Sequence, residues 1–204
     1  MKTVYIIDAV RTPIGRYGGK LSSIRPDDLL AHVIKALITR NGSVDVNMIE
    51  DVIAGAANQA GEDNRDVARM AALLAGLPVS VGGNTVNRLC ASGLQAVMDA
   101  SRAIMCGDGM LYIAGGAESM TRAPFVTAKS DGAWSRKTET FDTTMGWRFI
   151  NPKLKAMYGV DTMPQTAENV AQQFNIDRAD QDQFAFTSQQ RTTTAQAQGF
   201  FTHE

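Results

Sequence analysis

The sequence predicts an α/β fold in which helices cover both faces of a parallel β-sheet. Short apolar segments rich in β-branched residues alternate with longer segments of helical periodicity over the first two thirds of the chain. The helical segments end at Gly, Asn or Pro residues, as helices commonly do. Strands and helices that alternate at this spacing are typical of β-α-β units, whose strands are parallel.

Four short segments are the expected strands, at residues 3–10, 51–57, 83–90 and 110–119. The first is rich in Val and Ile and is followed by Arg-Thr-Pro and several glycines. The second is almost continuously apolar, which is typical of a strand buried on both faces of a sheet.

Three helices are expected between these strands, over residues 26–40, 65–77 and 91–109. Asp27 and Asp28 lie in the first turn of the first helix, where the helix dipole favours acidic side chains. The other two helices end at Gly residues, which stop helices efficiently.

The composition changes after Met120, where we expect a domain boundary. Residues 1–120 are expected to form the α/β domain, and residues 121–204 a second domain that does not continue the sheet. The polar, irregular stretch after the boundary holds both tryptophans of the chain. Helices are expected at residues 165–174 and after Asp177, a suitable helix cap.

Charge and hydropathy exclude several classes of function. The 204 residues are 44% hydrophobic and 20% charged, which is ordinary for a protein with a packed core. Twenty Lys and Arg residues against 21 Asp and Glu residues give a formal net charge of -1. Without a basic excess, we expect no nucleic-acid partner and no membrane docking. No segment approaches the ~18 consecutive apolar residues of a membrane helix.

Cysteine and histidine usage favours a reducing compartment and no metal site. The chain has two cysteines, Cys90 and Cys106, and two histidines, which are too few soft ligands for a zinc site. Asp8 and Arg11 interrupt the amino-terminal apolar run too early for a signal peptide. We therefore expect a cytoplasmic protein.

Cys90 is the residue best suited to chemistry, because it lies where an extended segment meets a helix. Backbone N–H groups and the positive dipole end at a helix N-terminus favour a thiolate. The same N–H groups can stabilise an oxyanion. The local sequence leaves open that Cys90 is a small buried residue between strand and helix. Cys106, near the other end of this helix, is expected to serve packing only.

Other candidate residues have simpler interpretations. His32 is expected on a solvated helix face, paired with Asp28 four residues earlier, and His203 is next to last in the chain. Neither histidine is placed to act as a general base. Gly115 and Gly116 fit either a phosphate-binding turn or a tight exit from a strand. The GRYGGKL segment lacks the spacing of a Walker A loop, so nucleotide hydrolysis is not expected.

Four motifs, in family order, resemble the amino-terminal half of thiolases, the acyl-CoA C-acyltransferases. They are VRTPIGRYGG, NRLCASGLQAV, AGGAESMTRAP and MPQTAENVA, and the resemblance extends over the whole chain. Within the family, NQAGEDNRDVARMAALLAGLP and FDTTMGWRFINPKLKAMYGVDTMP are most similar to the 3-oxoadipyl-CoA (β-ketoadipyl-CoA) thiolases of aromatic-compound degradation. The resemblance implies a layered α/β/α domain followed by a partly present loop domain that covers the pantetheine of coenzyme A.

The resemblance also implies a mechanism and a site. Cys90 would be the nucleophile that attacks the keto carbon of a 3-oxoacyl-CoA, expels acetyl-CoA and holds the remaining acyl group as a thioester. Coenzyme A would be a substrate, with no further cofactor. Met163 matches the family's substrate-lining Met, although a local packing role explains it equally well. Thiolases assemble through this half, so a homo-oligomer, a dimer or tetramer, is expected.

The family's histidine, second cysteine and catalytic Asn belong to Asn-Glu-Ala, Gly-His-Pro and Cys-x-Gly-Gly motifs that do not occur here. We therefore expect a fragment, inactive alone, that lacks the second thiolase half. Thr162 stands where acetoacetyl-type members often have His. Arg148 and Lys153 are candidates for binding a distal carboxylate, although a solvated loop face explains both residues equally well. An acetyl-CoA acetyltransferase, a fatty-acid 3-ketoacyl-CoA thiolase and a non-enzymatic CoA-binding fragment are the alternatives.

Overall fold

The computed structural model describes residues 2–202 and divides into two compact units, Met1–Phe125 and Val126–Glu204. The division falls shortly after the boundary expected at residue 120. The first unit contains the parallel sheet and Cys90, and the second contains Met163.

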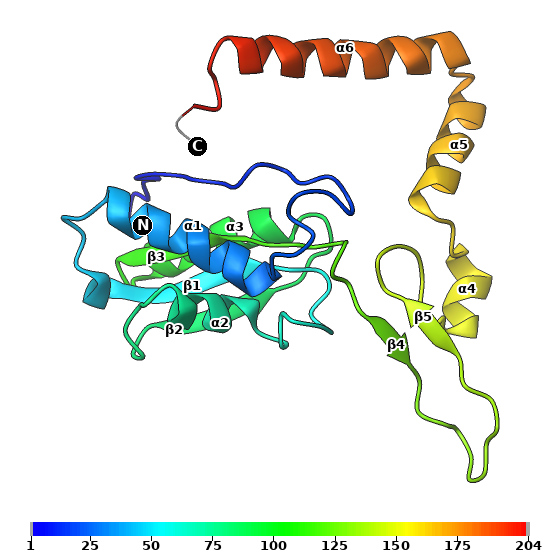
Figure 1. Ribbon diagram of the computed structural model, residues 1–204, viewed down its shortest axis with the longest axis horizontal. Helices are drawn as coiled ribbons and strands as arrows, with labels where there is room; N and C mark the ends of the chain where they lie inside the picture. The colour runs from blue at the N-terminus through cyan, green and yellow to red at the C-terminus, as the bar shows by residue number, and fades with distance from the viewer. Residues whose placement is uncertain (1, 203–204) are drawn as a thin grey trace. The chain divides into compact units, whose positions relative to one another are not determined.

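A three-stranded parallel sheet forms the middle layer of the first unit (Figure 1). Its strands lie in the order β2-β1-β3, with bounds Gly82–Val86 for β2, Ile49–Gly55 for β1 and Leu111–Gly116 for β3. The last residue of β1 pairs with the last residues of both neighbours. The carboxyl ends of the three strands therefore lie together at one end of the sheet.

Helices cover both faces of this sheet, so the expected α/β class is confirmed. The helices α1 (Pro26–Arg40) and α2 (Val67–Leu74) pack on one face, and α3 (Ser92–Cys106) packs on the other. Parallel strands need such crossovers because the chain must return to the same end of the sheet before each new strand.

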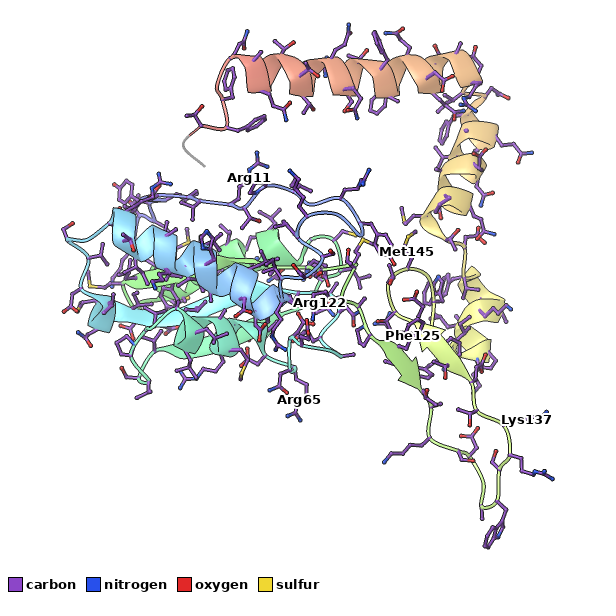
Figure 2. The ribbon with its side chains drawn as sticks, in the orientation of Figure 1. Arg11, Arg65, Arg122, Phe125, Lys137 and Met145 are labelled. Atoms are coloured by element: carbon purple, nitrogen blue, oxygen red, sulfur yellow. The ribbon has the colours of Figure 1, made fainter. Side chains whose placement is uncertain are left out.

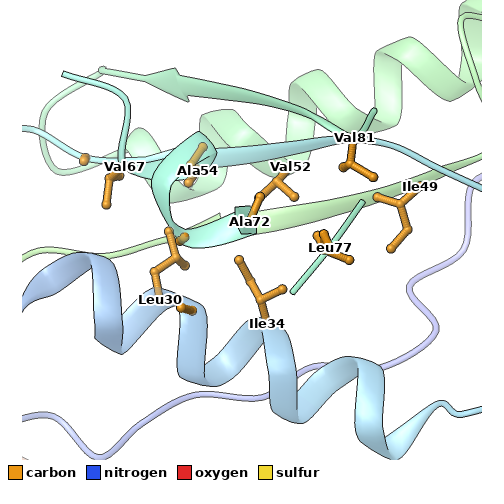
Figure 3. Close-up of a cluster of buried hydrophobic side chains, with 13 residues drawn as sticks. Leu30, Ile34, Ile49, Val52, Ala54, Val67, Ala72, Leu77 and Val81 are labelled. Atoms are coloured by element: carbon orange, nitrogen blue, oxygen red, sulfur yellow. The ribbon is translucent and has the colours of Figure 1, made fainter. Parts of the chain in front are cut away.

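Alternate residues of β1 face opposite layers, as the two-residue period of a strand requires. Val52 and Ala54 are buried against α1 and α2, in the larger cluster that also holds Ile34 (Figure 3). Ile53 points to the other face, where it packs with two alanines of α3. The core of the first unit thus lies on both sides of the central strand.

The helix ends follow local backbone chemistry. Asp66 caps α2 through its side chain, and Gly107 ends α3 in the left-handed conformation, with φ of 91°. The helix expected over residues 65–77 is shorter at both ends. Arg65 and Gly76 have φ of 69° and 87°, which an α-helix does not accommodate.

The expected strand over residues 3–10 is not formed, because nothing pairs with it. This segment has no regular secondary structure, and Tyr5, Ile6 and Ile7 are exposed. A cavity of about 220 Å³ is lined in part by residues 4–8 and 110–114, and a second of about 370 Å³ in part by residues 8–15 and 113–118. A β-strand requires a neighbour for its backbone N–H and C=O groups, and β-propensity alone does not supply one.

The second unit combines a small sheet with three helices and has little core of its own. Of its described residues, only Thr143 is buried. Asp177 caps the long polar helix, as expected. The elements are β4 (Phe125–Thr127, which begins at the unit boundary), β5 (Thr140–Asp142), α4 (Pro152–Tyr158), α5 (Met163–Phe174) and α6 (Arg178–Ala197). No helix within residues 2–202 has the length and apolarity needed to cross a membrane.

Charged side chains connect three loops beside the strand ends of the first unit. Arg122, which follows β3, donates from Nε to Glu62 Oε2 at 2.5 Å, and its Nη2 contacts the other carboxylate oxygen. Arg25 binds Asp27 through two nitrogens, at 2.7 and 2.9 Å, and reaches Glu62 at 3.4 Å. Figure 2 labels Arg122 among these loops. The hydrogen bonds from Arg122 lower the pKa of Glu62.

This lowered pKa makes the stability contributed by Glu62 depend on pH. The contribution is present above the unfolded-state pKa of Glu62 and is lost as the pH falls through the folded-state pKa. We expect Glu62→Gln to lower the free energy of unfolding near pH 7, and the difference from the parent to shrink towards about pH 3. Urea unfolding across this range, with the exposed Glu139→Gln as control, measures it. A difference that does not change with pH would contradict the assignment.

Candidate functional site

Cys90 lies in a tight turn between the end of β2 and the start of α3. Leu89, directly before it, has a left-handed φ of 50°, which is uncommon for a residue other than Gly. The Ser92 hydroxyl accepts a hydrogen bond from the Arg88 N–H at 2.8 Å and donates one to the Leu89 carbonyl at 2.6 Å. One buried serine therefore holds both backbone groups of the turn.

The Cys90 thiol is exposed in this turn. The alternative of a buried cysteine packed between strand and helix is therefore wrong for this structure. No side chain caps α3, whose first residue is two positions after Cys90. A nucleophile next to uncapped helix N–H groups is suited to acyl transfer, because such groups can stabilise an oxyanion that forms beside it.

Close backbone packing fixes the turn against the sheet. A Cβ atom on Gly55 would lie closer than 3.0 Å to backbone atoms of Ser92 and Gly93. A Cβ atom on Gly116 would lie equally close to the Gly55 carbonyl. Of the two interpretations of these glycines, the tight exit from a strand accounts for the packing at Gly116, whereas a Cβ on Gly115 would meet nothing within 4 Å. Only glycine permits three backbones to approach this closely.

The structure corrects two predictions, the packing role of Cys106 and the pairing of His32 with Asp28. Cys106, at the last position of α3, is exposed rather than packed. His32 does lie on the exposed face of α1, but within residues 2–202 no hydrogen bond or ion pair joins it to Asp28. The face of the sheet that carries α1 is opposite the one that carries α3, so His32 is not a partner for Cys90. His203 lies outside the described residues.

The candidate substrate residues of the second unit lie near its helix starts. Met163 is the first residue of α5 and is 74% exposed. Thr162 caps that helix through a reciprocal pair of hydrogen bonds with Gln165. Arg148 is half-buried before α4, and Lys153 is exposed in its first turn. Within residues 2–202, no three Cys, His, Asp or Glu side chains gather as metal ligands.

Sequence reasoning missed two residues near the turn, Asn87 and Glu118. Asn87 hydrogen-bonds both to the loop after β1 and to Leu89. Glu118 binds backbone N–H groups of the same loop from the end of β3. Both stand in motifs already noted, but the loop that they share lies 30 residues from Asn87 and about 60 residues from Glu118, so local patterns do not reveal the contact.

The family model described as "Thiolase, N-terminal domain" matches residues 4–204. The chain belongs to the thiolase family. It is 66% identical over 204 residues to a β-ketoadipyl-CoA thiolase of Acinetobacter baylyi. It is 60% identical to a 3-oxoadipyl-CoA/3-oxo-5,6-dehydrosuberyl-CoA thiolase of Escherichia coli K12. In both comparisons the alignment covers 100% of this chain and 51% of the relative.

A solved thiolase-family structure also matches the fold. The acetyl-CoA acetyltransferase of Bacillus anthracis superposes with a TM-score of 0.81 at 33% identity. This alignment covers 94% of the present chain and 47% of the other. The chain thus spans about half the length of these thiolases. The resemblance of its motifs to the family and to its 3-oxoadipyl-CoA members is confirmed.

The backbone contact at Gly55 can be tested by adding a single methyl group. We expect Gly55→Ala to lower the free energy of unfolding by about 1–3 kcal/mol, because the new Cβ forces the Cys90 turn away from β1. Chemical denaturation measures the change. Gly132→Ala is the matched control, since a Cβ there meets nothing within 4 Å. Equal free energies of unfolding for the two variants would show that the Cys90 turn can shift without loss of stability, and would contradict this prediction.

Proposed function

We propose that the protein containing this chain is a thiolase that cleaves 3-oxoadipyl-CoA, with Cys90 as its nucleophile. The observation that carries the proposal is the exposed thiol of Cys90, held in a constrained turn directly before an uncapped helix N-terminus. Identities of 60–66% to relatives named for this substrate support the choice of acyl group. The same resemblance supports a homo-oligomer with coenzyme A as substrate, and the cysteine usage supports a cytoplasmic protein.

The proposed reaction has two halves. The Cys90 thiolate attacks C3 of the 3-oxoacyl-CoA, the C2–C3 bond breaks, and the departing C2 carbon takes a proton to give acetyl-CoA. The remaining acyl group stays on Cys90 Sγ as a thioester. The thiol of a second coenzyme A then attacks this thioester, releases the shortened acyl-CoA and returns the free Cys90. This is covalent catalysis through an acyl-enzyme.

The present chain supplies only part of this machinery. Both steps require a base to remove a thiol proton, and the first also requires an acid for the leaving carbon. His32 is on the opposite face of the sheet, and the family's His and second-Cys motifs do not occur in these 204 residues. We therefore propose that the 204-residue chain does not turn over alone and that activity needs the second thiolase half.

An acyl-enzyme trapping experiment tests the nucleophile. After mixing with 3-oxoadipyl-CoA, we expect the full-length protein to gain the mass of one acyl group, and Cys90→Ala to gain none. Cys106→Ala is a matched control because it removes the other exposed cysteine, and it should acylate normally. Intact-protein mass spectrometry gives the readout. Acylation of Cys90→Ala would overturn the assignment.

A comparison of substrates tests the choice of acyl group. If Arg148 binds the distal carboxylate, Arg148→Gln should lower kcat/KM for 3-oxoadipyl-CoA by about tenfold, the worth of one hydrogen bond to a charged group. The value for acetoacetyl-CoA, which lacks that carboxylate, should not change. The parent should also prefer 3-oxoadipyl-CoA. Preference for acetoacetyl-CoA would favour the acetyl-CoA acetyltransferase alternative, and binding without turnover by the full-length protein would favour a CoA-binding module.

A further inference from the structure

Glu118 connects the end of β3 to the loop that follows β1. One carboxylate oxygen accepts a hydrogen bond from the Ala57 N–H at 2.7 Å, and the other accepts one from the Asn58 N–H at 3.3 Å. Ala117 extends the contact, because its N–H donates to the Gly55 carbonyl at 3.1 Å. Hydrogen bonds to a charged acceptor are roughly twice as strong as those between neutral groups. The carboxylate thus fixes where the loop after β1 lies.

Asn87 connects that loop to the turn that carries Cys90. Its side-chain Nδ2 donates to the Ala57 carbonyl at 3.0 Å, and its Oδ1 accepts from the Leu89 N–H at 2.9 Å. The side-chain amide of Asn87 therefore acts as both a donor and an acceptor. The hydrogen bonds run without a gap from Glu118 through Ala57 and Asn87 to Leu89, the residue joined to Cys90.

The conformation of Leu89 explains why this connection matters for Cys90. A left-handed residue other than Gly costs about 1–2 kcal/mol and persists where its surroundings hold it. The surroundings here are Asn87 on its N–H and Ser92 on its carbonyl. Because the side chain of Leu89 is 70% exposed, packing contributes little. The direction of the Cys90 Cα–Cβ bond then follows from the backbone at Leu89.

We propose that Glu118 and Asn87 are positioning residues that hold the Cys90 thiol in its attacking geometry. The proposal rests on the proposed function, in that Cys90 is taken as the nucleophile. Neither side chain needs to touch the substrate. Loss of either one releases Leu89 to an ordinary φ and turns the Cys90 side chain, and a misplacement of about 1 Å can lower a rate by about 100-fold.

The test uses the full-length protein with Asn87→Ala, Glu118→Ala and Glu118→Gln. We expect kcat for thiolysis to fall by about 100-fold in both Ala variants, with little change in KM. Glu118→Gln should recover part of this loss, because its amide oxygen still accepts from one of the two N–H groups. The rate of Cys90 carbamidomethylation by iodoacetamide should change in the same order. Glu50→Gln, the same chemical change at the other end of β1, is the control and should match the parent.

Three outcomes distinguish failure of the positioning role from failure of the proposed function. Parent-like kcat in Asn87→Ala and Glu118→Ala, while Cys90→Ala forms no acyl-enzyme, would overturn the positioning role and leave the nucleophile standing. An acylated Cys90→Ala protein would overturn the proposed function instead. If the Ala variants do not fold, the isosteric Glu118→Gln decides: about tenfold lower kcat at unchanged KM and melting temperature supports positioning, and parent-like kcat overturns it.

Discussion

The backbone contact between the end of β1 and the start of α3 is the constraint on which the rest of the first unit depends. Gly55 lies so close to Ser92 and Gly93 that no side chain fits between them. The helix must therefore begin at this point on the sheet. Gly116 of β3 lies equally close to Gly55, so the two strand ends and the cysteine turn form a single packed layer of backbone.

This close approach explains the composition of α3. The residues it buries are small, namely Ser92, Ala96 and Ala100, because larger side chains would push the helix away from the sheet and open the contact at Gly55. Three large residues lie on its other face, where Leu94 is 64% exposed and Met98 and Met105 are 38% and 39% exposed. The resemblance to thiolases implies a buried helix, and within this chain only one face of α3 is covered.

Local chemistry in the sequence predicts much of the fold. Features that depend on pairing between segments distant in the sequence could not be predicted in this way. The acidic first turn of α1, the Asp177 cap and the glycine that ends α3 each act within a few residues, so their helices were predictable. The segment 3–10 has the composition of a strand, but pairing depends on a neighbour that composition cannot supply. Cys90 was predictable because a helix begins two residues after it. Asn87 and Glu118 were not, since Glu118 binds amides about sixty residues away.

The exposed side chains of Tyr5, Ile6 and Ile7 and the outer edge of β3 have a consequence for the chain in a cell. Apolar side chains beside unpaired strand backbone are a template for strand addition, and chaperones and proteases recognise such surfaces in incompletely folded proteins. Exposure of these side chains would therefore make the 204 residues, as a free polypeptide, a target of cellular quality control. A polypeptide segment that covered the outer edge of β3 would therefore affect the abundance of the chain as well as its fold.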